Sequence, residues 1–482
     1  MVHEKVDALY QQNLAVFTCI EEKFNRLQSI PATITRDNIK QRLLAELNGE
    51  REKTLIADKW CFLKSFGIYS TFILFLIVGA IVGRNKKKTH ISIMFDCWSN
   101  NCMEFYDDII PRLKSTSIGY FYNNNKNYSY CCSLKGIDPL RGKRKYFFTS
   151  SASYSVLIKH FSQFFFYWNL SKKTDLNLVE LVVKLLFEIG KHLTMIEGTK
   201  IDLLVSAHDN GFSPYRHFIY TSNGVDGLLL IQNGGRVNLN ASYNNYIYAD
   251  YYAAWTARRL TNFTNMNCIG KFSSGSVRLD KRISETNSDS ANLYDILFIE
   301  QVYNCTDSIG APNHDAYIVG LNNLVSLQLH HANLRIAYCC RPNRAVFENP
   351  LLINDIDEVL LDSNIIVLKP NPGETYDHVK KTHLVVAFDS SVRCEALMMN
   401  KPVVTCNYTG YPNDFVVVNS CEDAVIYNAE YVEFERKLLS MHQNSVNNDV
   451  NENCKNIWSM GKSEKSASEI IAELINTELK LQ

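Results

Sequence analysis

Residues 364–412 read NIIVLKPNPGETYDHVKKTHLVVAFDSSVRCEALMMNKPVVTCNYTGYP, and this stretch decides the fold. The β-branched run Ile365–Leu368 stops at a Pro- and Gly-containing turn, and a second apolar run, Leu384–Phe388, stops at Asp-Ser-Ser. Helical spacing then begins at Val392, until Lys401-Pro402 ends the helix before another strand. Strands that alternate with helices at this spacing predict a parallel sheet covered by helices.

Both polar turns of this stretch follow strands, at the edge where parallel sheets bind ligands. Ser390 and Ser391 precede a helix, so that hydroxyls and free backbone N–H groups favour a phosphate. Glu395, about one turn later, can accept hydrogen bonds from ribose hydroxyls. An N-cap Ser with a capping-box Glu explains the same spacing without a ligand, and it is the simpler interpretation.

The two segments together resemble the nucleotide-sugar half of GT-B glycosyltransferases. They are most similar to the capsule and surface-polysaccharide group, which includes polysialyltransferase-like, Kdo-transferase-like and polyglycerolphosphate-transferase-like enzymes. That group has a KPHP turn and an SS…EAL…KPV segment, matched here by KPNPGE and SSVRCEALMMNKPV. Asn371 replaces the usual His; its amide can bond a phosphate but cannot become cationic. The resemblance implies a donor site made of Lys369, Asn371, Pro372, Gly373, Glu374, Ser390, Ser391 and Glu395.

A candidate catalytic base lies in the N-terminal half of the chain. The strand Ile201–Ala207 ends at His208-Asp209, and a glycosyltransferase needs a base to deprotonate the acceptor hydroxyl. Either side chain can serve as that base. An Asx-turn of Asp209 towards Gly211 explains the same residues equally well.

The resemblance also supplies cleft residues. Asn233 and Gly234 follow the next strand, where the family has Gln-His-Gly, so a base at Asn233 is not expected. From the same half, the resemblance implies cleft positions for Gly270, Ser273 and Ser274. In the second half, Arg341 follows a strand; it is either a clamp for a diphosphate or carboxylate, or a surface arginine.

Composition narrows the function classes. The chain has 482 residues, and 50 Lys and Arg balance 50 Asp and Glu, so no basic field recruits nucleic acid. None of the 14 cysteines forms a C-x-x-C pair, and no Asp-x-Asp cluster with supporting context is present, so no metal is predicted. No cofactor is expected beyond a nucleotide-sugar substrate.

The N-terminal region combines helical patterns with a membrane-type segment. Two helical patterns, broken at Pro31, predict either a spacer that holds the enzyme off the membrane or an oligomerisation module. Ser65–Gly83 carries no charge and is just long enough to cross a bilayer, which needs about 20 apolar residues. The basic cluster Arg84–Lys88 favours a single-pass anchor with a cytosolic C-terminal domain; a luminal placement, a monotopic anchor and a buried core helix are alternatives.

The domain plan follows from these elements. The sequence predicts an α/β fold of two Rossmann-like domains (GT-B), preceded by an N-terminal helical segment and one transmembrane helix. His90–Phe95 is the expected first strand, Asp96–Asn101 its loop and Phe105–Leu113 the following helix. The expected divisions are a helical segment 1–58, an anchor 59–87, an acceptor domain 88–285, a nucleotide-sugar domain 292–440 and a C-terminal helix 441–482.

The predicted function is a membrane-anchored glycosyltransferase that moves a sugar, or a sugar-like phosphate unit, from a nucleotide donor to a surface glycan or lipid-linked acceptor. A catalytically inactive sugar-binding or scaffold protein of the same fold is the first alternative, and an epimerase-like sugar-nucleotide enzyme is the second. A structural membrane protein whose N-terminal helices carry the function is the third alternative. The expected partners are the nucleotide-sugar donor, the acceptor, the membrane and a second copy bound through the N-terminal helices.

Overall fold

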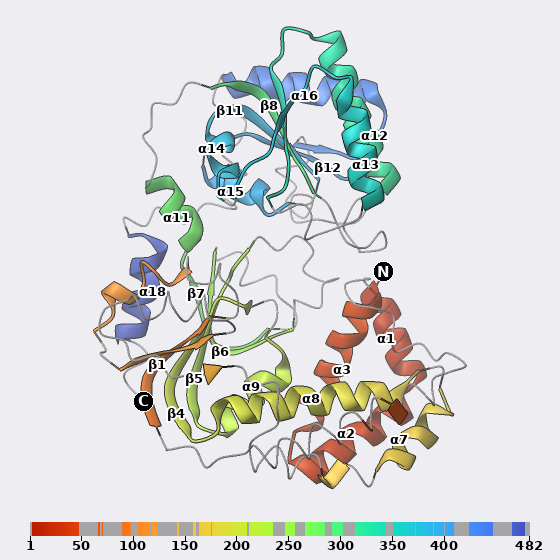
Figure 1. Cartoon of the computed structure of the whole chain (residues 1–482), viewed down its shortest axis with the longest axis vertical. Helices are drawn as coiled ribbons and strands as arrows, with labels where there is room; N and C mark the ends of the chain where they lie inside the picture. Colours follow the sequence, from red (N-terminus) through yellow and green to blue (C-terminus); the bar gives the residue numbers. More distant parts are fainter. Residues whose placement is uncertain are drawn as a thin grey trace.

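The chain folds into two parallel sheets with helices on both faces (Figure 1). The computed structural model describes residues 2–47, 66–67, 70, 89–97, 105–114, 117–122, 142–143, 158–160, 163–174, 176–209, 212–234, 246–255, 266–284, 292–301, 314–342, 350–371, 373–388, 390–399, 401–408, 424–446 and 465–477. Pro372, the linker at 285–291 and nearly all of the predicted membrane span lie outside these residues.

The first sheet has seven parallel strands in the order β3-β2-β1-β4-β5-β6-β7. Its strands are β1 (Thr89–Cys97), β2 (Ile118–Tyr122), β3 (Gly142–Lys143), β4 (Thr199–Ser206), β5 (Val225–Ile231), β6 (Ile247–Ala254) and β7 (Met266–Ser273). β1 extends two residues beyond the prediction, so Asp96 lies in the strand and not in the loop. The expected α-helix at Phe105–Leu113 is wrong: turns and the short 3-10 helix η2 (Ile110–Arg112) take its place, because Pro111 cannot continue an α-helix.

The second sheet has six parallel strands in the order β10-β9-β8-β11-β12-β13. Its strands are β8 (Tyr294–Ile299), β9 (Ile336–Cys339), β10 (Ile366–Leu368), β11 (Thr382–Ala387), β12 (Val403–Cys406) and β13 (Val425–Ile426). Numbered within the sheet, this order is 3-2-1-4-5-6, which is the Rossmann order, and the first sheet has the same order with a seventh strand. The expected α/β fold with two Rossmann-like sheets is therefore confirmed.

Helices cover both faces of each sheet and enclose four apolar clusters. α7 (Phe164–Ser171), α8 (Leu178–Ile196) and α9 (Pro214–Ser222) lie on one face of the first sheet, and α11 (Val277–Ser284) and α18 (Ala467–Thr477) on the other. On the second sheet, α12 (His314–His330), α13 (Pro350–Leu361) and α16 (Tyr431–Val446) oppose α14 (Thr375–Lys380) and α15 (Val392–Met398).

The N-terminal helices belong to the first domain. The helices α1 (Val2–Gln12), α2 (Leu14–Gln28) and α3 (Ala32–Leu47) lie beside α8 in Figure 1. Their buried apolar side chains belong to the same cluster as those of α8 and α9. Arg42 of α3 forms an ion pair of 2.7 Å with Glu188 of α8, and Tyr215 of α9 donates a hydrogen bond to Thr35. A free-standing spacer is thus not what the structure shows, because these helices complete a core. Homo-oligomerisation through them stays a prediction.

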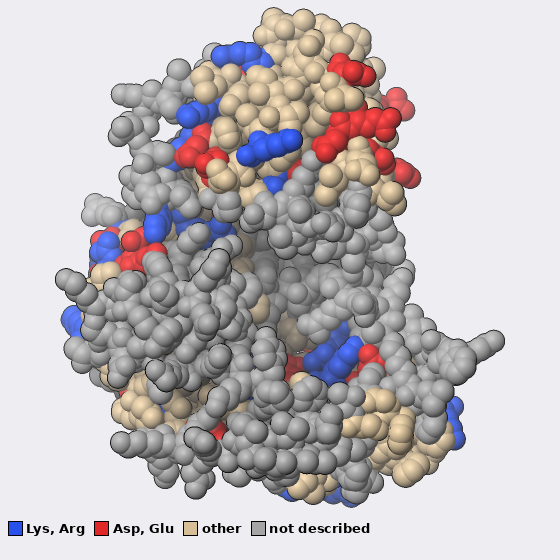
Figure 2. Space-filling view, in the orientation of Figure 1, with Lys and Arg blue, Asp and Glu red and all other residues tan. Residues whose placement is uncertain are grey.

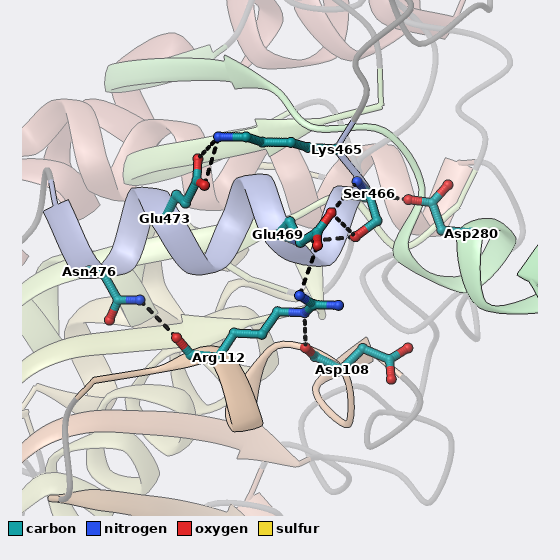
Figure 3. A network of polar contacts seen from close by, with 9 residues as sticks. Asp108, Arg112, Asp280, Lys465, Ser466, Glu469, Glu473 and Asn476 are labelled. Atoms are coloured by element: carbon teal, nitrogen blue, oxygen red, sulfur yellow. Dashed lines mark hydrogen bonds and ion pairs between the residues drawn. The ribbon is translucent and has the colours of Figure 1, made fainter.

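The C-terminal helix α18 returns to the first domain (Figure 3). Arg112 forms an ion pair of 2.9 Å with Glu469, and the backbone N–H of Lys114 donates to the Asn476 side chain. At the start of α18, the backbone N–H of Ala467 donates 2.5 Å to the Asp280 carboxylate on α11. The second domain is therefore inserted between two parts of the first.

The charged side chains of the described residues are unevenly distributed over the face shown in Figure 2. On the face in Figure 2, acidic side chains gather over α12 and α13 of the second domain, while Lys and Arg are scattered. No described helix is both long enough and apolar enough to cross a membrane. The predicted span lies outside the described residues except at positions 66, 67 and 70.

Candidate functional site

The second sheet offers a ligand edge where its strand order reverses, between β8 and β11. In open α/β sheets, ligands bind beyond the carboxyl ends of the strands at such a point. The turn after β10 and the Ser-Ser segment after β11 both lie at this edge. The topology therefore brings the two predicted donor-binding segments to one side of one sheet.

The KPNPGE turn is closed by its own side chains. The Asn371 backbone N–H and side-chain amide donate to the two Glu374 carboxylate oxygens at 2.7 and 2.8 Å. These bonds lower the pKa of Glu374. Gly373 has φ +98°, a conformation that favours glycine. Lys369 is exposed at the end of β10, so its ammonium is the group of this turn most accessible to an anion.

The Ser-Ser segment starts α15. The Ser390 hydroxyl accepts from the Val392 N–H at 3.3 Å, and Ser391 is the N-cap residue without a side-chain capping bond. Both serines are partly exposed. The capping-box alternative is not what forms, since Glu395 bonds elsewhere and the Ser391 side chain does not cap the helix.

Glu395 is a buried acid. Its side chain is 2% exposed and accepts a hydrogen bond of 2.9 Å from the Tyr376 hydroxyl on α14. Burial raises its pKa, against the opposing charge of Arg278 and the Tyr376 bond. The Tyr376–Glu395 bond joins α14 to α15 and so holds the two motif segments together. The predicted contact of Glu395 with a ribose stays a prediction; the observed contact is structural.

Arg341 lies beside an acid that the sequence reasoning missed. Its backbone N–H donates to the Glu300 carboxylate at 2.5 Å, and the other Glu300 oxygen accepts from the Tyr338 hydroxyl at 3.1 Å. Glu300 directly follows β8 and is 4% exposed, so it lies at the switch point itself. A charged residue directly after a buried apolar strand was the available signal.

The predicted base Asp209 ties three strand ends together. Its carboxylate accepts from the Tyr252 hydroxyl of β6 at 2.9 Å and from the Asn233 N–H after β5 at 3.3 Å. It is 2% exposed. His208 is only partly buried, and its backbone N–H donates to the Ser206 hydroxyl. Of the two candidate bases, His208 is thus the less buried residue, although its Nδ1 atom is buried.

The remaining N-domain positions divide into two kinds. Gly234 follows β5 and faces open space, since an added Cβ would meet no atom within 4 Å. Gly270 lies within β7, where a Cβ would come 2.7 Å from Tyr251, so close strand packing explains this glycine. Ser273 is exposed at the end of β7, whereas the Ser274 hydroxyl is buried and bonded to backbone carbonyls.

A buried ion pair at the switch point of the first sheet was not predicted. Arg216 of α9 lies 2.6 Å from Asp96 at the end of β1, and the Ser206 hydroxyl donates to the same carboxylate oxygen at 3.0 Å. The Tyr106 hydroxyl donates to the Asp96 backbone carbonyl and accepts from the Ala207 N–H. This network fixes the turn that carries His208.

Two contacts relate the domains. Trp255, at the end of β6, belongs to the buried cluster formed by α15 and the second sheet, and its N–H groups donate to Gln232. Arg278 of α11 is close enough to Glu395 to favour the ionised carboxylate. The carboxyl edge of the first sheet therefore meets α15 of the second domain.

Within the described residues, no group of three or more His, Cys, Asp or Glu is placed to hold a metal ion.

Fold and site define an α/β protein of two Rossmann-like domains whose candidate residues gather at strand carboxyl ends. No protein-family model matches the sequence, and no curated protein sequence matches it. Among solved structures, a putative UDP-N-acetylglucosamine 2-epimerase from Listeria monocytogenes is 12% identical over 82% of this chain and 98% of its own, with a TM-score of 0.49.

Two further similar structures are a wall teichoic acid polymerase and the protein MurG. The wall teichoic acid polymerase TagF is 12% identical over 88% of this chain and 99% of its own, with a TM-score of 0.46. MurG from Acinetobacter baumannii is 10% identical over 80% of this chain and 99% of its own, with a TM-score of 0.39. At these values the similarity assigns neither a family nor an activity to the chain.

Proposed function

We propose that the chain is a glycosyltransferase that moves a sugar, or a sugar-like phosphate unit, from a nucleotide donor to a glycan or lipid-linked acceptor. The main support is the Tyr376–Glu395 hydrogen bond, which holds the KPNPGE turn and the Ser-Ser segment together at the ligand edge of a Rossmann-ordered sheet. In this proposal the donor diphosphate lies between the Lys369 ammonium and the serines at the start of α15.

The leaving nucleotide carries the charge that the site must stabilise. An exposed lysine and hydroxyls at a helix start are groups that bind phosphate oxygens. Such preorganised donors act where negative charge grows in the transition state. Glu374 and Glu395 are engaged by Asn371 and Tyr376, and we assign them the role of shaping the site.

We assign the acceptor-activating base to His208. An imidazole is a general base of the kind that can take the hydroxyl proton as the acceptor oxygen attacks the sugar. Asp209, with both oxygens already accepting hydrogen bonds, positions the ends of β4, β5 and β6 instead.

A second candidate is a non-catalytic sugar-nucleotide-binding protein. The burial of Asp209 and its bonds to Tyr252 and Asn233 favour this alternative, because they leave only His208, which is partly buried, of the two candidate bases. Asn371 and Asn233 also favour the non-catalytic protein, since neither side chain can act as an acid or base at neutral pH.

Donor binding separates these possibilities. Purified full-length chain is mixed with CMP-, UDP-, GDP- and CDP-linked sugars, and thermal stabilisation and released nucleotide are measured. One donor class is expected to stabilise the protein, and Lys369→Ala and Ser391→Ala to abolish that shift. Ser363→Ala is the matched control, since this hydroxyl donates to the Leu360 carbonyl and accepts from the Ile365 N–H within its own turn.

His208→Gln distinguishes the enzyme from the binding protein. If the proposal holds, this variant keeps the donor-induced stabilisation and loses nucleotide release. Donor binding without release in the unmodified chain supports the binding protein. Conversion of the donor sugar while it remains attached to the nucleotide supports an epimerase, and the absence of any donor-induced shift refutes the nucleotide-sugar site.

A further inference from the structure

Helix α7 exposes large apolar side chains on the surface of the first domain. Its sequence is FFFYWNLS, and the Phe165 side chain is 66% exposed. Nearby, Ile158 is 59% exposed and Phe66 is 55% exposed. Phe164 and Tyr167 of the same helix are buried in the core with α8, so α7 is anchored by one face and presents the other.

Basic side chains surround this apolar face. The Lys172 ammonium lies 3.8 Å from the centre of the Trp168 ring, and the Lys23 ammonium lies 4.6 Å from that of Phe166. Lys159 and Lys173 are exposed. Residues 158–174 contain no Asp or Glu, and Glu22 on α2 is an exposed acid on the neighbouring helix.

The charge-free segment of the chain begins beside this helix. The Phe66 ring packs edge-on against Phe164 at 6.3 Å between centroids. From Gly67 to Gly83 the sequence has no charged residue, and Arg84–Lys88 then adds four basic residues. The start of the most apolar stretch of the chain thus contacts α7 at Phe164.

We propose that the surface formed by Phe66, Ile158, α7 and its lysines lies in the headgroup region of an anionic lipid bilayer. Aromatic rings favour the boundary between acyl chains and headgroups, and lysines extend their ammonium groups to lipid phosphates. A symmetric contact with a second copy is disfavoured, because it sets the same lysine rim against itself. In Figure 1, α7 lies at the end of α8 that points away from the first sheet, on the side of the first domain opposite the second domain, so this contact leaves the strand carboxyl ends accessible.

Bromolipid quenching tests the proposal on the full-length chain in reconstituted vesicles. Phe165→Trp adds a fluorophore on the proposed surface, and Leu329→Trp, at a 65% exposed position on α12, is the matched control. Vesicles consist of phosphatidylcholine with or without phosphatidylserine, and part of the phosphatidylcholine is brominated. The emission added at position 165 is expected to be quenched in anionic vesicles, and the emission added at position 329 to be unaffected.

Charge reversal supplies the second measurement. Adding Lys172→Glu and Lys173→Glu to Phe165→Trp is expected to lower the partition of this surface roughly tenfold or more, since each lysine near an anionic membrane contributes about a fivefold change. Equal quenching at positions 165 and 329 overturns the proposal. Emission at 165 that shifts with protein concentration and not with lipid identifies a second copy as the occupant and also overturns it.

Discussion

Removing one partner of the Asp96–Arg216 pair is expected to destabilise the first domain strongly. The two side chains are 0% and 4% exposed, and their charged atoms lie 2.6 Å apart. Arg216→Met keeps an apolar chain that packs on Phe212, but it withdraws the cation from a buried carboxylate. Breaking a buried ion pair in this way costs about 3–5 kcal/mol.

The expected loss is large enough to measure by melting. For a domain of this size, each kcal/mol lowers Tm by about 2–4 °C, so Arg216→Met should lower it by roughly 10 °C. Adding Asp96→Asn removes the uncompensated charge. The double variant should therefore lose less unfolding free energy than the two single variants lose together, by on the order of 2 kcal/mol.

Pulse proteolysis in urea, with fragments identified by mass spectrometry, follows the first domain separately from the second. The matched control is Lys200→Met, because Lys200 and Asp226 form an exposed pair at 3.3 Å on neighbouring strands β4 and β5. Exposed pairs contribute about 0–1 kcal/mol. If Arg216→Met costs no more than Lys200→Met, or if the double variant is strictly additive, the buried pair does not hold this edge together.

Two further predictions concern pH, with opposite signs. Burial raises the pKa of Glu395, so the folded chain keeps this proton at pH values above the usual pKa of 4.5. The free energy of unfolding therefore falls as the pH rises from 4.5 through the raised pKa. Glu395→Gln should flatten that decline in thermal melts recorded between pH 4 and 8. Burial lowers the pKa of His160 to about 3, so on acidification the unfolded chain binds a proton at this histidine at a higher pH than the folded chain does. The free energy of unfolding therefore falls as the pH drops from 6.5 towards 3. His160→Gln should reduce that acid sensitivity, and an unchanged pH profile in either variant contradicts its assignment.

In the second domain, the sequence was sufficient for β10, β11, α15 and β12, but not for α14 or β13. Alternation of apolar runs with helical spacing marked β10, β11, α15 and β12, because in a parallel sheet both faces are covered and buried strands read as continuous apolar runs. It failed at Phe105–Leu113, where apolar spacing suggested a helix that Pro111 interrupts. The strand β13 was also missed, since two residues carry no detectable period.

The candidate site was predictable only in part. Segment positions followed from the motifs, but the partners of each side chain depend on residues distant in sequence. Asp96 and Arg216 are 120 positions apart, and nothing local marks either as one half of a pair. In the same way, the spacing of Ser391 and Glu395 suggested a capping box. In the structure, α15 packs against α14, and Glu395 accepts a hydrogen bond from Tyr376.

The return of α18 to the first domain has a consequence for synthesis on the ribosome. The apolar cluster that contains Phe95 and Tyr106 is completed by Ile471 and Ile475, which emerge last. Domains usually fold in order from the N-terminus as they are made. Here the inserted second domain has all of its strands and helices available before the first domain can close its outer face. The apolar surface of the first domain therefore stays exposed to solvent until α18 has been synthesised. A truncation near residue 465 removes α18 and leaves that surface uncovered.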